Sequence, residues 1–411
     1  MKRIKQIVKT LFAIGVSFAV LMGCSKKSNV SDDFLDSKSS DNTSLSTKDT
    51  DTQKDFFDSV VEAPETDFSF ELTEDYEGVI IKKYKGYDVH MKVPSEIQGV
   101  PVVEIGEFAF RSTPVMTVVI PDSVKKIDNG VFSGCKFLEN VKFPKSITSI
   151  PSSCFDGCES LTQYIIPESI KNIEESAFRG TGLASIYIPD DVTFISYDYN
   201  GEEIESKSVF VSCKKLTEVH LPSSMKSIPY GMFKDCESLT SIKLPEGITC
   251  IGAEAFSGCA SLAELTIPSS VTRIRRNAFD KTALVVLNIP NSVTELECTF
   301  SECHSLREIH LPDSLTVISD HLFTKGGYFS EEVLLEKVNI PASTQKIGEA
   351  AFFYCHKLNE VVIPDSLTEV EWLSGGLSME YDAESIAFKG CSNLSLATQK
   401  RIKELGYPGK F

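Results

Sequence analysis

Twelve cysteines have the widest chemical range in this chain, because a thiolate can bind a metal, attack an electrophile or form a disulfide. Eight of them share one context, three residues after a phenylalanine: Cys135, Cys158, Cys213, Cys236, Cys259, Cys303, Cys355 and Cys391. Residues stacked once per repeat lie about 5 Å apart with parallel side chains, which opposes a disulfide. Threonine takes the same place at 113, 181 and 282. We therefore expect a buried ladder of reduced thiols that serves the core.

Metal-binding and catalytic constellations are not recognisable among the other reactive residues. The closely spaced cysteine pairs lack zinc-type spacing and a second pair of ligands. His220 and His310 occupy equivalent places, but several repeats separate them, which is too far for one ion. No serine elbow, Cys–His pair or phosphate loop is found, and no two carboxylates have glycosidase spacing. The sequence predicts no cofactor, no metal and no enzymatic activity.

Aromatic residues near one irregular stretch are the candidates for partner binding. Tyrosine offers a large contact area at low entropic cost, which suits recognition. Asn200–Gly201 favours a tight reversal, so the stretch is expected to project as a hairpin. An ordinary solvated sheet with scattered apolar residues is the alternative. The candidate residues are Tyr187, Tyr197, Tyr199 and Ile165, rimmed by Glu202 and Glu203.

A repeat must position all of these residues. Apolar residues stand one and three places before each repeat proline, which is typical of a strand with one buried face. A second apolar pair three and six places after the proline predicts another short extended segment, and a phenylalanine then fills the interior. Most intervals are 22 or 23 residues, which indicates a solenoid of β and turn. The prolines are 94, 121, 144, 167, 189, 222, 245, 268, 290, 312, 341 and 364.

Two departures from the repeat carry information. In units with threonine the next proline follows the phenylalanine by eleven residues rather than twelve, which predicts a tighter corner. Insertions enter between Pro189 and Phe210, after Phe323 and after Pro364. Insertions in repeat proteins become loops off one face, often the binding face.

The unit Gly252-Ala-Glu-Ala-Phe-Ser-Gly-Cys259, followed by Leu262 to Ile274, resembles the leucine-rich repeats of BspA-like bacterial surface proteins. The resemblance implies a leucine-rich-repeat solenoid of the α/β horseshoe class, predominantly β and turn, with parallel strands stacked one per coil. It also implies a non-enzymatic, adhesin-like cell-surface protein that binds host proteins, other cells or glycans. The alternative is an envelope-internal scaffold or glycan-binding module that never meets a host.

The N-terminal end has the parts of a secretory signal in residues 1–23, a basic start and a short apolar run. Leu21-Met22-Gly23-Cys24 resembles a bacterial lipobox, which implies lipidation of Cys24 and a lipid-anchored, surface-exposed protein of the bacterial cell envelope. Plain secretion is the alternative. The membrane is then contacted through the lipid only, and a net charge of −17 opposes nucleic acid.

The remaining organisation follows from composition and alternation. Residues 24–66, rich in Ser, Asp, Lys and Thr, are expected to form a flexible tether. Residues 67–110 read as an N-terminal β cap with a variant first repeat, and residues 111–394 as the repeat array. Residues 395–411 read as a C-terminal cap helix that starts at Ser395 and ends before Gly406. Its expected core-facing residues are Leu396, Ala397, Ile402 and Leu405.

Overall fold

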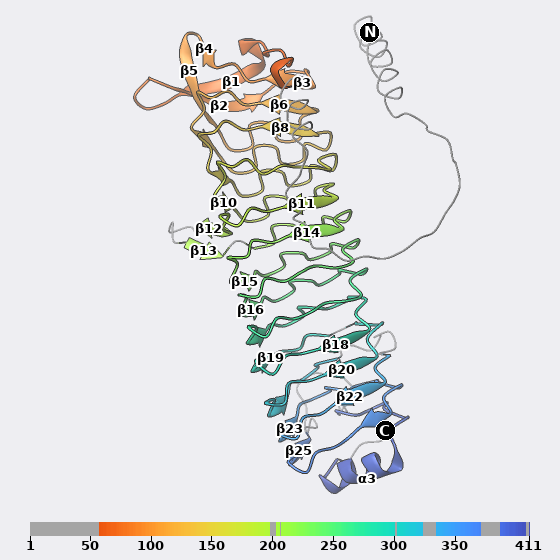
Figure 1. The fold of residues 1–411 in the computed structure, drawn as a ribbon. Helices are drawn as coiled ribbons and strands as arrows, with labels where there is room; N and C mark the ends of the chain where they lie inside the picture. Colours follow the sequence, from red (N-terminus) through yellow and green to blue (C-terminus); the bar gives the residue numbers. More distant parts are fainter. Residues whose placement is uncertain are drawn as a thin grey trace, which may run out of the picture. The chain divides into compact units, whose positions relative to one another are not determined.

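The computed structural model describes residues 57–197, 203–205, 207–300, 302–323, 334–370, 387–407 and 411. The chain divides into two units, Met1–Gln53 and Lys54–Phe411, and every described residue lies in the second. Cys24 and the expected signal segment therefore lie outside the described residues. Within the second unit, short parallel strands stack coil upon coil (Figure 1).

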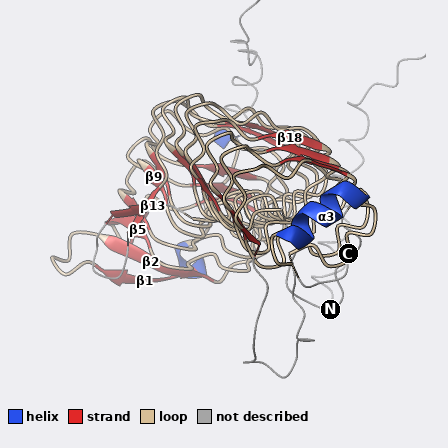
Figure 2. Ribbon diagram, turned by 90° about the horizontal axis from the view of Figure 1, so that it is seen from below, coloured by secondary structure: helices blue, strands red, loops and turns tan. Residues whose placement is uncertain are grey.

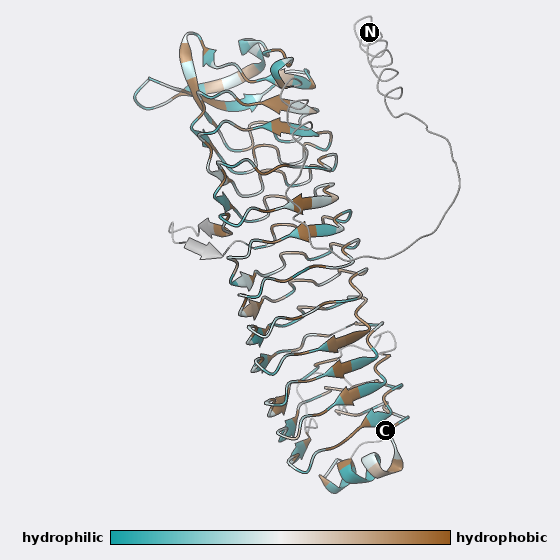
Figure 3. Ribbon diagram, in the orientation of Figure 1, coloured by the Kyte–Doolittle hydropathy of each residue, from teal (hydrophilic) through white to brown (hydrophobic). Residues whose placement is uncertain are grey.

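Strands that precede the repeat prolines form one column of parallel pairs, here called column A. Its outward and inward residues alternate, as the sequence predicts: Val219 is buried between exposed Glu218 and His220. The arrows of column A accordingly carry hydrophobic and hydrophilic colours side by side (Figure 3). The strands are β3 (His90–Lys92), β6 (Thr117–Val119), β8 (Asn140–Lys142), β11 (Ser185–Tyr187), β14 (Glu218–His220), β18 (Val286–Asn288), β20 (Glu308–His310), β22 (Lys337–Asn339) and β24 (Glu360–Val361).

Two-residue strands that follow the prolines form a second column, here called column B. The apolar residue six places after each proline points inward, as Ile251 and Ile274 do. This confirms the second extended segment. The strands are β7 (Lys126–Ile127), β9 (Ser149–Ile150), β10 (Asn172–Ile173), β15 (Ser227–Ile228), β16 (Cys250–Ile251), β17 (Arg273–Ile274), β19 (Glu295–Leu296), β21 (Val317–Ile318), β23 (Lys346–Ile347) and β25 (Glu369–Val370).

Phenylalanine rings stack through the interior as one ladder, which confirms the predicted registration of the repeat. Consecutive ring centroids from Phe110 to Phe388 lie 5.1 to 5.9 Å apart. Tyr84 of the cap continues the ladder, with its ring 5.4 Å from Phe110. Each coil covers the apolar side chains that the preceding coil would otherwise leave exposed, so the core grows along one axis.

The turn around each phenylalanine needs an unusual backbone. The residues two places before and after Phe155, Ser153 and Gly157, have φ values of 54° and 72°. This left-handed conformation lets alternate N–H groups point to the next coil, where Phe155 donates to the carbonyl of Ala177 at 2.8 Å and Gly157 to that of Arg179 at 2.8 Å. Glycine at the second place avoids the steric cost of a side chain there.

The N-terminal cap contains the strands expected from alternation. β1 (Phe68–Leu72) pairs antiparallel with β2 (Val79–Tyr84), after the short 3-10 helix η1 (Glu65–Asp67). β2 runs parallel to β5 (Val100–Ile105), which pairs antiparallel with β4 (Glu96–Ile97) and leads into column B through β7. The cap thus covers the first coil, and its strand β5 pairs directly with the first strand of column B.

The C-terminal end is closed by helix α3 (Leu396–Glu404), which Figure 2 shows across the last coil. Ser395 accepts a hydrogen bond from the Thr398 N–H at 3.1 Å, so the predicted N-cap is confirmed. Ile402 is buried and Leu405 is half-buried against the core, as expected. Leu396 and Ala397 are exposed, so their predicted roles are wrong. Tyr407, which follows the helix, is buried in their place and contacts Phe388 edge-on.

The insertion after Pro189 forms an antiparallel hairpin of β12 (Ile195–Tyr197) and β13 (Glu203–Glu205). This confirms the hairpin predicted from Asn200–Gly201. The insertions after Phe323 and Pro364 fall largely outside the described residues. In the part of the chain that the structure describes, no helix is long and apolar enough to cross a membrane.

Candidate binding surface

The cysteine ladder has a structural role in the interior. The Cys236 thiol donates to the backbone carbonyl of Phe210 in the preceding coil at 3.2 Å, and Cys259 donates likewise to Phe233 at 3.1 Å. Burial raises the pKa of these thiols, to about 11 for Cys213, so they stay protonated at neutral pH. The predicted buried ladder is confirmed, and it supplies no nucleophile.

Threonine units have both a different side-chain bond and a tighter corner. The Thr181 hydroxyl donates to the carbonyl of Phe178 in its own turn at 2.9 Å, and Cys213 of the next coil donates to that same carbonyl at 3.0 Å. In a cysteine unit the corner carries one more turn, closed by the Leu138 N–H on the Cys135 carbonyl at 3.0 Å. In the threonine unit, buried Leu183 stands two positions after Thr181, whereas Leu138 stands three positions after Cys135.

Tyr187 lies on the outward side of β11 and is 53% exposed. Its ring stacks on that of His220, with centroids 4.5 Å apart and an interplanar angle of 11°. The stack follows from the parallel register, which pairs Tyr187 with His220. Ile165 holds the equivalent place one coil earlier and is 56% exposed. Three successive coils therefore present an apolar, an aromatic and an imidazole side chain on one face.

The hairpin grows from the other column. Thr193 bridges to Asn172 of β10, and the Asn172 amide pairs with both backbone groups of Ile195 at 2.8 Å each. Figure 1 shows β12 beside column B and β11 in column A. Tyr197, on β12, is thus not brought to Tyr187.

The other residues predicted to rim this patch also belong to the hairpin or lie beyond the description. Glu203 starts β13, in the hairpin of column B. Tyr199 and Glu202 lie outside the described residues. The structure therefore divides the candidate set into a strand-face group, Ile165 and Tyr187, and a hairpin group.

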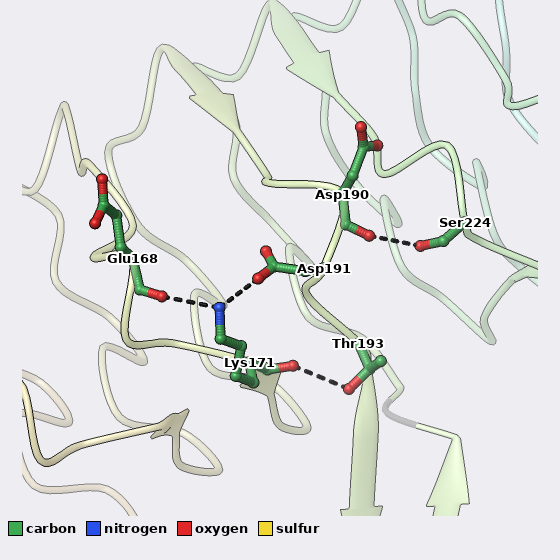
Figure 4. Close-up of polar contacts among 6 residues, drawn as sticks. All are labelled: Glu168, Lys171, Asp190, Asp191, Thr193 and Ser224. Atoms are coloured by element: carbon green, nitrogen blue, oxygen red, sulfur yellow. Dashed lines mark hydrogen bonds and ion pairs between the residues drawn. The ribbon is translucent and has the colours of Figure 1, made fainter.

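The root of the hairpin is fixed by polar contacts to the coils on both sides (Figure 4). Lys171 donates to the Glu168 carbonyl at 3.0 Å and forms an ion pair with Asp191. On the other side, the Ser224 hydroxyl donates to the Asp190 carbonyl at 2.8 Å.

The Asp190 carboxylate completes this anchoring. It accepts the Ser223 N–H at 2.6 Å, and that bond lowers the pKa of Asp190. The corner is thereby tied to the coil that follows, so the hairpin starts from a defined point of the array.

The outward face of column A is poor in acid, although the chain carries a net charge of −17. No carboxylate stands two places before any repeat proline, and none stands four places before the first five. Acids enter the face at Glu218, and further along Lys337 pairs with Glu308 at 3.3 Å and with Glu360 at 3.6 Å. The acid-free positions of the first five coils are His90, Lys92, Thr117, Val119, Asn140, Lys142, Gln163, Ile165, Ser185 and Tyr187.

Potential metal ligands are dispersed. Within the described ranges, no group of three or more His, Cys, Asp or Glu side chains could hold a metal ion. His310 instead lies 3.0 Å from Glu308 of its own strand.

A family profile described as "BspA type Leucine rich repeat region (6 copies)" matches residues 95–201, 202–328 and 325–373. The chain belongs to this family. This confirms the resemblance noted in the sequence and the solenoid fold that it implies. In this chain the phenylalanine and cysteine positions of the repeat form the interior, so the outward columns and the insertions are what it presents to a partner.

Two solved structures have the same architecture. A leucine-rich repeat protein from Bacteroides ovatus is 26% identical, with a TM-score of 0.66 and coverage of 80% of this chain and 80% of its own. A leucine rich cell surface protein from Faecalibacterium prausnitzii is 23% identical, with a TM-score of 0.52 and coverage of 85% and 98%. Among curated protein sequences, none matches this chain.

Proposed function

We propose that this BspA-type repeat protein is a non-enzymatic binding protein that presents the outward face of column A to a protein or glycan partner. The observation that carries the proposal is the exposed group Ile165, Tyr187 and His220 on three successive coils. Aromatic residues that are held rigidly and exposed are the usual anchors of binding surfaces. A rigid array holds their backbone in place, which lowers the entropic cost of binding.

The proposal includes the place where binding occurs. The basic and apolar residues 1–23 followed by Cys24 favour export and lipid attachment at the bacterial cell envelope. A surface-exposed position gives the face access to host proteins, other cells or glycans. Replacement of Cys24 by Ala should move the protein from the detergent phase to the aqueous phase and abolish lipid labelling. Unchanged partitioning would contradict the anchor.

Protease treatment of intact cells tests exposure. Shaving should remove the repeat array from intact cells and leave a periplasmic or cytoplasmic control protein untouched. Full protection in intact cells, with cleavage only after lysis, would favour the envelope-internal scaffold.

The binding face is tested with two separate variants in the full chain. Tyr187→Ala should weaken retention of the cognate cells or matrix proteins at least tenfold, about 1.4 kcal/mol, without changing the fold. Val362→Ala is the matched control, because Val362 is an exposed apolar residue at the far end of the same column. A loss seen only with the double variant Tyr197→Ala/Tyr199→Ala would assign binding to the hairpin instead.

A further inference from the structure

The segment that precedes the cap is part of column A. The Ala63 N–H donates to the Lys92 carbonyl at 2.9 Å, and the Lys92 N–H donates to the Val61 carbonyl at 2.9 Å. Glu62 thereby forms a parallel bridge with Lys92 of β3. Residues 61–63, which composition assigns to the tether, thus add a strand-like edge to the first coil, and Phe57 and Asp58 lie in a helical turn just before them.

The same segment also covers the outward face. The Lys142 ammonium lies 3.7 Å from the Asp58 carboxylate and 5.8 Å from the centre of the Phe57 ring. Phe57 is only 8% exposed, yet it does not belong to the interior core. From Glu62 beside β3 to Phe57 beside β8, the segment spans three consecutive coils.

Two residues at outward positions of β6 are buried as well. Thr117 and Val119 occupy outward positions but are buried, and Val119 pairs in register with Lys142. Val119, like Phe57, lies outside the interior core. The outward face of the first coils therefore already holds a peptide of this chain, recognised by its aromatic ring and its neighbouring carboxylate.

We propose that the uncovered continuation of this face binds an extended peptide of a partner protein with the same chemistry, an aromatic residue next to a carboxylate. The proposal rests on the proposed function and names the class of partner. Ile165 and the Tyr187–His220 stack offer the apolar and aromatic contacts in the coils that follow Lys142. The aromatic side chain of the peptide stacks on this platform as Phe57 does beside Lys142.

Charge selects the acidic neighbour. A chain with a net charge of −17 repels acidic partners over most of its surface. The acid-free part of column A, which ends at Tyr187, is the exception, although Glu218 shares the next strand with His220. A carboxylate therefore meets less repulsion at Ile165 and Tyr187, and exposed Lys243 further along the column can attract it.

The length of the peptide follows from the coil spacing. Ile165, Tyr187, His220 and Lys243 stand on successive coils, three steps in all. At about 4.8 Å per step this is about 14 Å, the length of roughly four extended residues.

Peptide binding to the purified full chain in detergent tests the proposal. The probe is a labelled peptide with the sequence of residues 55–61, Asp-Phe-Phe-Asp-Ser-Val-Val, measured by fluorescence anisotropy. Binding should saturate and should weaken as salt rises, because salt screens the attraction between the peptide carboxylates and the exposed Lys243. Peptides with both phenylalanines replaced by alanine, or both aspartates by asparagine, should bind at least tenfold more weakly.

Variants of the protein locate the site. Tyr187→Ala should weaken peptide binding at least tenfold, whereas Val362→Ala should leave it unchanged. Peptide that merely displaced the chain's own segment at Lys142 would be insensitive to Tyr187→Ala, and that result would overturn the proposal. Absence of binding up to roughly 1 mM, where the binding free energy is only about 4 kcal/mol, would overturn it as well.

The other occupants of the face give distinct results. Preference for a glycan over the peptide, or a dimer that Tyr187→Ala dissociates in light scattering, would each overturn the peptide proposal. Loss of cell or matrix retention in Tyr187→Ala without any peptide binding would leave the proposed function standing and remove this inference alone.

Discussion

The two faces of a column A strand differ in what they repeat. The inward residues keep their type in coil after coil, as Val219 and Ile309 do, and lie above a ladder of phenylalanine rings. The outward residues change from Ile165 to Tyr187 to His220 within three coils. An inward side chain meets nearly the same neighbours in every coil, so packing restricts it. An outward side chain meets water, so it is free to serve binding.

The comparison can be broken most severely by alkali, because the ladder thiols ionise far more readily in the unfolded chain than in the folded interior. The eight ladder thiols all have raised pKa values through burial, about 12 for Cys303 and Cys391. The unfolded chain releases these protons near pH 9, while the folded chain retains them. Stability is therefore present below pH 9 and falls as the pH rises. A thiol whose folded-state pKa lies well above 10 contributes about 1 kcal/mol between pH 9 and 10, so the ladder as a whole contributes several kcal/mol.

Urea denaturation of the full chain from pH 7.5 to 10.5, with a reductant present, measures this loss. Cys259→Ala should reduce the slope of the unfolding free energy against pH by about one proton. A free energy that stays flat through pH 10 would contradict the buried thiol ladder.

Truncation of one ring tests the interior in a single coil. Phe256 lies 5.6 Å from Phe233 and 5.8 Å from Phe279, so Phe256→Ala leaves a cavity between two stacked rings. We expect a loss of about 3–5 kcal/mol in the free energy of unfolding. Thr266→Ala, on the outward face nearby, should change it by less than about 0.5 kcal/mol. Equal effects of the two variants would refute the distinction between the faces.

A smaller effect separates ladder thiols from other cysteines. Cys259→Ala removes the hydrogen bond to the Phe233 carbonyl, and we expect a loss of about 1–2 kcal/mol. Cys250→Ala makes the same change at a half-buried thiol of column B and should cost less. A larger cost at Cys250, measured by thermal or urea unfolding, would mean that the ladder bonds contribute little.

The smallest stability effect is expected on the outward face. Tyr187→Ala should leave the free energy of unfolding within about 0.5 kcal/mol of the parent, because the ring is half exposed and stacks on His220, which is itself exposed. The same measurement on the full chain serves as the folding control for binding. A loss as large as that of Phe256→Ala would make Tyr187 a structural residue and sharpen the boundary between the faces.

Period and residue type predicted most of the array. The buried columns, the phenylalanine ladder and the reduced thiols all recur with the repeat, so their environment can be inferred from any one coil. The hairpin was also predictable, because Asn200–Gly201 is a local turn signal. The prediction of which side of α3 faces the core was half wrong. A single helix at the end of the stack occurs once, so no repeated pattern shows which of its residues point inward.

The placement of the candidate binding residues was not predictable in the same way. Tyr187 and Tyr197 are close in sequence, but the coil carries the chain from column A to column B between them. Phe57 and Lys142 are far apart in sequence, and neither belongs to a repeated contact. No local pattern encodes such a pair.

By itself, the sequence determined the solenoid, because each coil repeats the same apolar spacing and can bury it only against its neighbours. The tertiary structure alone decided which residues share the outward face. Stacking brings Ile165, Tyr187 and His220 together across three coils and lays Phe57 over the same face at Lys142. Such contacts depend on the path of the whole chain, and outward positions carry no periodic packing constraint that would reveal them in advance.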